Sequence, residues 1–510
     1  MSFRFLGLLA LALSSQVLLL LLSSCSEAEV VAELRSLQGS EDAVFLCRDA
    51  TGAGHRFDQC PDLDPSDDEK LAGRRSIMAL VTQTITDEVA VVDVTAGRVV
   101  DVDRTTPGFG FLRVGGRPVA IAASPGGVAS FVAVADPGRN GIFGLPTSCL
   151  TAPSADQASR DLTTWPACRL HATPGELTVL VEPPVGDSVF KSCGSNEAEP
   201  EQPAGAGTEC PANLQTEEGP KGRRKLVVSL PDLGQLVVID AQSLLDIRPG
   251  DFPNCTIERV VELKAEVPAG VEQTLPTDLA TECTDEQTLT PPPRNQRPPQ
   301  PAGFAVGGDK LYVADQAAPV IHVLDASTAC ALSELPSLLP LSQREPEREV
   351  TTRRVSVSPL TPSGKRFLYA IDAEDQPGAS VMVFDVSPGS TDPTPLVRPG
   401  SPELPSEKPD RLALGSSARD VTFAYRDLPY VDPTTGVGVF GAQCDPRPDQ
   451  PASSPGVLAR PSSDFTGGAR PGLLRGLFGF ILLTNGQIAV VDVDDFDAPC
   501  RRPVSANSST

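Results

Sequence analysis

An all-β fold is predicted by three features of this 510-residue sequence. Short apolar runs recur along the chain, turn residues separate them in pairs, and consecutive rather than alternate positions are apolar. Such pairs are typical of β-hairpins, and the 51 prolines and 43 glycines disfavour long helices. Strands that are apolar on both faces need cover on both faces. Small sheets stacked in a ring provide that cover, so we expect a β-propeller of six to seven blades.

The recurring run follows one template, in which four mostly apolar residues are closed by Asp. It occurs at 89–93, 236–240, 321–325, 381–385 and 488–492. A second apolar run precedes each copy, at 77–81, 225–230, 311–314, 367–371 and 479–483, and a weaker sixth copy combines 131–135 with 142–145. The Asp is expected to accept hydrogen bonds from N–H groups of the next turn.

A further strand is expected upstream of several hairpins, at 117–122, 301–306, 353–358 and 418–424. The spacing between copies is irregular because polar, Pro-rich insertions interrupt the pattern at 186–221, 264–300 and 441–472. Their composition predicts exposed loops. We therefore assign a propeller domain to residues 73–503, with a disordered tail at 504–510.

Two stretches resemble the repeat of YVTN-type β-propellers. The first begins Arg117-Pro118-Val119 and runs to Gly127; the second is Lys310–Asp315 followed by Val320–Asp325. The resemblance implies a propeller fold in a bacterial protein and hardly constrains function.

The N-terminus predicts export, because Arg4 is followed by an apolar run from Phe5 to Leu22. A cleaved soluble signal and a retained membrane-spanning helix are the alternatives. The ending Leu22-Ser23-Ser24-Cys25 resembles the bacterial lipobox, which implies a signal peptide at 1–24 and a lipid on Cys25. Ser26 in place of Asp implies, by the same resemblance, an outer-membrane lipoprotein facing the periplasm or the surface.

Residues 25–72 are acidic and weakly periodic, so we expect a solvated tether, with a small hairpin between Cys47 and Cys60 as an option. A calcium loop at 62–69 is the alternative there, although the stretch lacks the glycine and terminal glutamate of an EF-hand loop.

The cysteines predict disulfides, because export places them in an oxidising compartment and no close pair has metal-site spacing. Neighbours that bracket polar loops are the pairs 47/60, 149/168, 193/210 and 255/283, although connectivity does not follow from sequence. The candidates are Cys47, Cys60, Cys149, Cys168, Cys193, Cys210, Cys255, Cys283, Cys444 and Cys500. Eleven cysteines remain after Cys25, so at least one is unpaired within the chain.

Catalytic chemistry finds little support in the sequence. There is no Gly-x-Ser-x-Gly motif and there are three histidines: His322 lies in a strand template, His171 beside Cys168, and His55 in the expected tether. Propeller lactonases hold a divalent cation in the central channel. Asp136, Asp315 and Asp372 follow the second strand of their repeats and could ring one end, although turn capping is the favoured explanation for them.

Two functions from different classes remain. The first is a non-catalytic binding or assembly scaffold, held at the membrane through Cys25 and contacting a protein partner. The second is a metal-dependent propeller hydrolase or lactonase, with a divalent cation such as calcium in the channel. Nucleic-acid binding is excluded as a main role, because a net charge of −24 repels phosphate backbones.

Overall fold

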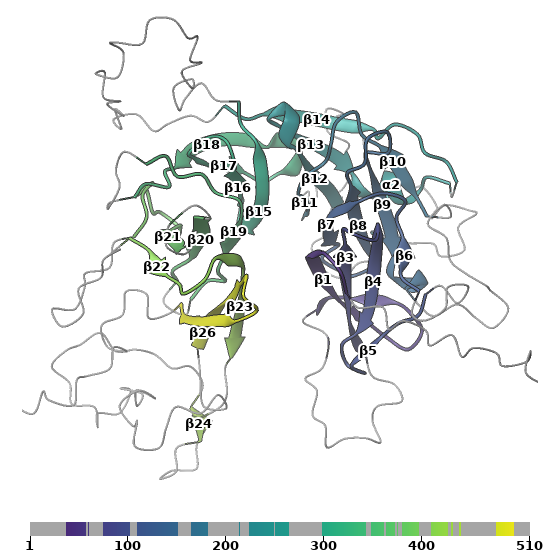
Figure 1. The fold of residues 1–510 in the computed structure, drawn as a ribbon, viewed down its shortest axis with the longest axis horizontal. Helices are drawn as coiled ribbons and strands as arrows, with labels where there is room; N and C mark the ends of the chain where they lie inside the picture. The colour runs from purple at the N-terminus through teal and green to yellow at the C-terminus, as the bar shows by residue number, and fades with distance from the viewer. Residues whose placement is uncertain are drawn as a thin grey trace, which may run out of the picture.

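Six small antiparallel sheets follow one another in sequence order round a common axis, the arrangement of a six-bladed β-propeller (Figure 1). The predicted all-β propeller is thereby confirmed. The computed structural model describes residues 37–57, 60, 75–102, 110–150, 165–181, 214, 224–248, 250–264, 298–342, 348–361, 364–372, 375, 380–396, 410–426, 430–431, 438–439 and 476–493.

We number the blades 1 to 6 along the chain and give their strands from the axis outward. Blade 1 contains β1 (Ser40–Arg48), β3 (Ser76–Gln83), β4 (Glu88–Asp93) and β5 (Arg98–Val99), with β2 (Gly54–His55) on β1 and β6 (Leu112–Arg113) on β4. Blade 2 contains β7 (Pro118–Ala123), β8 (Ala129–Val134), β9 (Gly141–Pro146) and β10 (Ala167–Arg169). Blade 3 contains β11 (Leu177–Val181), β12 (Arg224–Leu230), β13 (Gln235–Asp240) and β14 (Ile257–Glu262).

Blade 4 contains β15 (Pro301–Gly307), β16 (Lys310–Asp315), β17 (Ile321–Asp325) and β18 (Ser333–Leu338). Blade 5 contains β19 (Val355–Val357), β20 (Phe367–Asp372), β21 (Ser380–Asp385) and β22 (Leu412–Ala413). The described part of blade 6 contains β23 (Ala418–Arg426), β26 (Gly476–Leu483) and β27 (Ile488–Asp492). The short elements are η4 (Thr147–Cys149), η7 (Pro231–Leu233), α2 (Ala241–Leu245), η10 (Ala329–Ala331) and the hairpin β24 (Tyr430–Val431) with β25 (Gly438–Val439).

Every copy of the sequence template is the third strand of a blade, and the run before it is the second strand. The two form a hairpin, as predicted; in blade 3, for example, Leu226 pairs with Ile239. The upstream runs are the innermost strands β7, β15, β19 and β23. The structure also confirms the role of the closing Asp. The side chains of Asp93, Asp240, Asp325 and Asp385 accept hydrogen bonds from the backbone N–H groups of Ala96, Gln242, Ser327 and Ser387.

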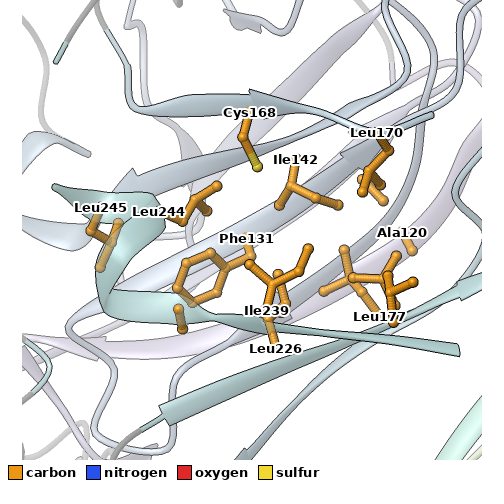
Figure 2. Packing of buried hydrophobic residues seen from close by; sticks show 14 of the residues in the cluster. Ala120, Phe131, Ile142, Cys168, Leu170, Leu177, Leu226, Ile239, Leu244 and Leu245 are labelled. Carbon is orange, nitrogen blue, oxygen red and sulfur yellow. The ribbon is translucent and has the colours of Figure 1, made fainter. Parts of the chain in front are cut away.

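Apolar side chains on both faces of the strands pack between neighbouring blades. Figure 2 shows the cluster between blades 2 and 3, where Phe131 and Ile142 meet Leu226 and Ile239 beside Leu244 and Leu245 of α2. Equivalent clusters join blades 1 and 2, 3 and 4, 4 and 5, and 5 and 6. Burial of both faces is therefore the main source of stability, at roughly 25 cal/mol for each Å² of apolar surface removed from water.

Blades 1 and 6 differ from the others, because each packs only one face into an apolar cluster of described residues and has exposed apolar side chains on the other. Phe45 on β1 is 53% exposed, and Ile488 and Val490 on β27 are 60% and 50% exposed. Near the axis the two blades do touch, since the guanidinium of Arg419 donates a hydrogen bond to the carbonyl of Ser40. A polar contact thus joins blades 1 and 6 at the inner edge, and no apolar cluster of described residues spans this junction.

The expected tether must be shortened. Residues 40–55 form β1 and β2, and β1 pairs with β3 from Ser40↔Gln83 to Arg48↔Ser76. The acidic composition of 25–72 hid this strand, because its apolar residues 43–47 lie between charged ones.

Two disulfides are described, and one of them corrects the expected pairing. Cys47 is bonded to Cys60, as the sequence suggested, and Cys168 to Cys255, not to Cys149. The pair 255/283 is therefore wrong as well. Cys149 and Cys330 are also disulfide-bonded; Cys330 was not among the candidates. Cys25, Cys193, Cys210, Cys283, Cys444 and Cys500 lie outside the described residues.

No helix within the described ranges is long and apolar enough to cross a bilayer. The signal peptide, the calcium-loop alternative at 62–69, the tail at 504–510 and nearly all of the three insertions lie outside those ranges.

Candidate functional site

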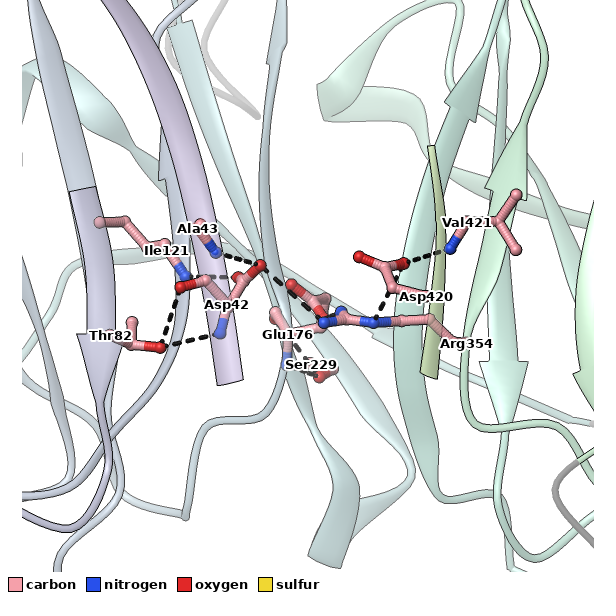
Figure 3. Close-up of polar contacts among 9 residues, drawn as sticks. All are labelled: Asp42, Ala43, Thr82, Ile121, Glu176, Ser229, Arg354, Asp420 and Val421. Carbon is pink, nitrogen blue, oxygen red and sulfur yellow. Dashed lines mark hydrogen bonds and ion pairs between the residues drawn. The ribbon is translucent and has the colours of Figure 1, made fainter. Parts of the chain in front are cut away.

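Four charged side chains from four blades meet at the axis of the propeller (Figure 3). They lie at the beginning of inner strands: Asp42 is the third residue of β1, Glu176 and Arg354 directly precede β11 and β19, and Asp420 is the third residue of β23. Inner strands converge on the axis, with β1 against β7, β7 against β11, β15 against β19, and β19 against β23. Residues far apart in sequence therefore become neighbours. We call these four residues the axial cluster.

Arg354 is the centre of the axial cluster. Its Nη1 donates to Oε2 of Glu176, its Nη2 lies 3.9 Å from Oδ1 of Asp42, and its Nε lies 3.9 Å from Oδ1 of Asp420. Blade 4 makes room for this side chain through Gly303. A Cβ there would lie 2.9 Å from the carbonyl oxygen of Arg353 and 3.0 Å from the Cα of Arg354.

Hydrogen bonds fix Asp42 and Glu176 in place. Oδ2 of Asp42 accepts a hydrogen bond from the N–H of Ile121 in blade 2, at 2.9 Å. The N–H of Glu176 donates to Oγ of Ser229 in blade 3, at 2.8 Å. The cluster thus connects blades 1, 2, 3, 5 and 6 through polar contacts.

Burial determines the protonation of the cluster. It raises the pKa of Glu176 to about 8; the positive charge of Arg354 acts against this rise, and the negative charge of Asp42 adds to it. Burial also raises the pKa of Asp42, again against the effect of Arg354. Glu176 therefore keeps its proton near neutral pH, which makes it a chemically competent proton donor.

The donor set does not fit a divalent cation. Three carboxylates at one axis would suit calcium, but the guanidinium of Arg354 lies between them and supplies the positive charge that a metal ion would bring. Among the described residues no group of three or more His, Cys, Asp or Glu side chains is arranged to hold a metal.

The Asp residues singled out in the sequence lie elsewhere. Oδ1 of Asp315, at the end of β16, accepts from the N–H groups of Ala317 and Ala318, which is turn capping. Asp372, at the end of β20, binds the guanidinium of Arg348 and lies 3.6 Å from that of Arg411. The N–H of Asp136 donates to Oδ1 of Asn140 in the turn after β8.

His322 lies within β17 and is fully buried, but it is more than a packed strand residue. Its Nε2 lies 3.0 Å from Oδ2 of Asp315 and its Nδ1 lies 2.7 Å from Oε1 of Glu334, so it bridges three strands of blade 4. Burial on its own lowers the pKa of His322, but the two carboxylates outweigh it and the net shift is upward. His55 bonds to Asp49 beside the Cys47–Cys60 disulfide, and His171 is exposed.

Sequence reasoning missed the axial cluster altogether. The available signal was a charged residue at, or directly before, the start of an expected inner strand. Arg353–Ser358 and Ala418–Ala424 both carried it, but which charges face the axis depends on how the blades close into a ring.

Comparisons with known proteins found solved structures of low similarity and no related sequence. No protein-family model matches the sequence, and no curated protein sequence matches it. Among solved structures, dihydro-haem d1 dehydrogenase NirN shares 11% identity with a TM-score of 0.31, over 62% of this chain and 43% of that one. A protein of unknown function from Desulfotomaculum acetoxidans shares 9% identity (TM-score 0.29; 60% of this chain, 62% of that one).

A candidate 6-phosphogluconolactonase from Bacteroides uniformis shares 10% identity with a TM-score of 0.33, over 89% of this chain and 92% of that one. The chain thus spans less than two thirds of the first two structures. Likenesses this low identify neither a ligand nor a reaction for the chain.

Proposed function

We propose that this chain is an exported lipoprotein, anchored through Cys25 to the outer membrane, whose YVTN-like propeller is a non-catalytic scaffold that binds a protein partner. One observation carries the proposal. The charged side chains at the axis, where enzymes of this architecture place their chemistry, are engaged with one another around Arg354. Their arrangement favours holding blades together over binding a substrate.

The strand order supports contact through the ends of the propeller. Insertion 186–221 lies between β11 and β12, and insertion 441–472 between β23 and β26, so both leave from the ends of inner strands. Because the strands of each blade alternate in direction, the connections from first to second strand all lie at the same end of the propeller, and both insertions are connections of this kind. Loops on a rigid scaffold are where binding residues gather, so we assign the partner to this end, which also carries the β19–β20 turn.

The alternative, a metal-dependent hydrolase or lactonase, is not favoured by the donor set at the axis. Glu176 could donate a proton, but an arginine lies where a metal-dependent reaction would need the ion.

Photo-crosslinking in cells tests the scaffold proposal. A crosslinking residue at Leu360, exposed in the β19–β20 turn, is expected to capture one discrete partner. The matched control is Ile85, equally apolar and exposed in the β3–β4 turn at the opposite end, which should capture none. Deletion of 441–472 should remove the Leu360 adduct. Equal capture from both ends, or lactone hydrolysis by the purified protein that requires added metal, would contradict the proposal.

The anchor is tested separately. Cys25→Ala should release the protein into the soluble fraction or leave it unprocessed, because the lipid chains would supply the membrane affinity. Normal processing with unchanged membrane association would rule the anchor out.

A further inference from the structure

The insertion between β14 and β15 is held at both of its ends by carboxylates of blade 4. The N–H of Lys264, its first residue, donates to Oε2 of Glu334 on β18 at 2.9 Å. The N–H of Gln300, its last residue, donates to Oδ2 of Asp315 at the end of β16 at 3.0 Å. These two acceptors are the carboxylates that flank His322, so one side chain is connected to both ends of the insertion.

His322 can hold both carboxylates only while it carries two ring protons. Its Nδ1 lies 2.7 Å from Oε1 of Glu334, and its Nε2 lies 3.0 Å from Oδ2 of Asp315. An imidazolium has an N–H on both nitrogens, whereas a neutral imidazole has one N–H and one lone pair. Loss of one proton therefore leaves a carboxylate opposite a lone pair, in a site where the side chain of His322 is 0% exposed.

The two carboxylates are not equally fixed. Asp315 is fully buried and accepts three backbone N–H groups, one directly before β15 and two in the turn after β16. Glu334 accepts one backbone N–H, and its side chain is 10% exposed. A neutral His322 is therefore expected to keep its N–H on Nε2, towards Asp315, and Glu334 is the side chain that can turn to water.

Blade 3 covers this side of His322. Leu324 lies on the same face of β17, two residues further on, and belongs to the apolar cluster between blades 3 and 4. Arg259 of β14 reaches this side from blade 3, and its guanidinium donates to two backbone carbonyls in the β17–β18 connection. Lys264 contributes its backbone N–H and is itself exposed. The two flanking carboxylates are thus the charged groups that act directly on His322.

We propose that His322, with Asp315 and Glu334, is a proton-dependent clamp on both ends of this insertion. The imidazolium holds the Lys264 end through Glu334 and the other end through Asp315. Loss of its proton releases the Lys264 end alone, because Glu334 then turns to water while Asp315 keeps its three backbone donors.

The direction of the pH dependence follows from the charges. Burial on its own lowers the pKa of His322, but the two carboxylates outweigh it, so the net shift from 6.5 is upward. The clamp therefore holds both ends at pH 6 and releases Lys264 at higher pH. This regulation goes beyond the proposed scaffold role and requires neither a partner nor a lipid.

Amide hydrogen exchange in the full-length protein tests the clamp. Each rate is divided by that of an unstructured amide at the same pH, which leaves the protection due to structure. Protection of the Lys264 N–H should fall by about tenfold or more as the pH rises through the pKa of His322, because its hydrogen bond to a charged group is lost. Protection of the Gln300 N–H should stay level, as should that of the Leu263 N–H, which donates to the carbonyl of Gly234.

The pKa itself is measured in the same protein by NMR of ring-labelled histidine, since the chain has three histidines. His322→Gln identifies the signal of His322.

Glu334→Gln is a variant with the opposite expectation. Its amide group can donate to the lone pair of a neutral His322 while its oxygen accepts from Lys264, but an imidazolium requires the oxygen for itself. Protection of Lys264 should therefore rise, not fall, as His322 loses its proton. Glu262→Gln, an exposed residue of β14 two positions before Lys264, is the matched control and should keep the wild-type fall.

Level protection of Lys264 up to about pH 10, or equal changes at Lys264 and Gln300, would overturn the proposal. A fall in Glu334→Gln that matches wild type would overturn it too, because Glu334 would then not be the released group. Neither partner capture nor membrane association enters this readout, so failure of the clamp and failure of the proposed function are distinguishable.

Discussion

At the residue scale, buried charges make the stability of the molecule depend on pH in defined directions. His322 has a pKa above its ordinary value of 6.5 because of Asp315 and Glu334, despite the opposing effect of burial. A group whose pKa is raised by folding stabilises the protein fully below its unfolded pKa, and this contribution is lost as the pH rises through the folded pKa.

We therefore predict that His322→Gln lowers the free energy of unfolding by about 3 kcal/mol at pH 6, because two buried carboxylates lose their cation. The loss should shrink as the pH rises through the raised pKa of His322, because wild type then loses the imidazolium charge as well. Urea unfolding across this range measures the difference, and a loss of equal size at every pH would contradict the assignment.

Glu176 gives the second prediction at this scale. Its pKa is raised from 4.5 to about 8, so its stabilising contribution is present below pH 4.5 and is lost as the pH rises from 4.5 to 8. Glu176→Gln cannot ionise. Relative to wild type, this variant should gain stability between pH 5 and pH 9, as measured by thermal unfolding; a parallel pH dependence of the two proteins would show that Glu176 ionises normally.

Arg354 gives the third prediction at the residue scale. Arg354→Met should lower the free energy of unfolding by about 3–5 kcal/mol, because the buried side chains of Asp42 and Glu176 and the carboxylate of Asp420 lose their common partner. Arg353→Met, one residue earlier, is the matched control and should cost much less. Chemical unfolding of both variants at pH 7 measures the two losses of unfolding free energy. Equal losses would contradict the central role given to Arg354.

At the element scale, local features were predictable and long-range links were not. The template Asp residues cap the turns as expected, because capping depends on residues two or three positions away. The Cys47–Cys60 disulfide was suggested by proximity for the same reason. Cys168–Cys255 was missed because it joins β10 of blade 2 to the segment before β14 of blade 3, a contact that only blade packing creates.

The two disulfides should contribute unequally. Cys47–Cys60 closes a loop with a sequence separation of 13, and Cys168–Cys255 one of 87. The loop-entropy model gives about 3 kcal/mol for the first and about 4–5 kcal/mol for the second. Paired Cys→Ser variants compared by denaturant unfolding should show the larger loss for Cys168/Cys255. A larger loss for Cys47/Cys60 would mean that entropy of the unfolded chain is not the dominant effect.

At the scale of the whole molecule, the fold was predictable because it is made of repeated local patterns. Apolar residues on both faces of the 236–240 and 381–385 strands required cover on both sides, which blade stacking provides. The axial cluster could not be predicted in this way. Asp42, Glu176, Arg354 and Asp420 meet only after the sheets are arranged round an axis, and β1 was itself hidden by its acidic surroundings.

The central claim is that the axial cluster of this propeller holds the blades together through Arg354, without a metal. The most direct test is the metal content of the purified full-length protein, measured by elemental mass spectrometry after equilibration with micromolar Ca²⁺, Mg²⁺ and Zn²⁺ and removal of free ions. Wild type is predicted to retain far less than one equivalent of any divalent metal. One tightly held ion per chain that is lost in Glu176→Gln or Asp42→Asn would contradict the claim and favour the hydrolase instead.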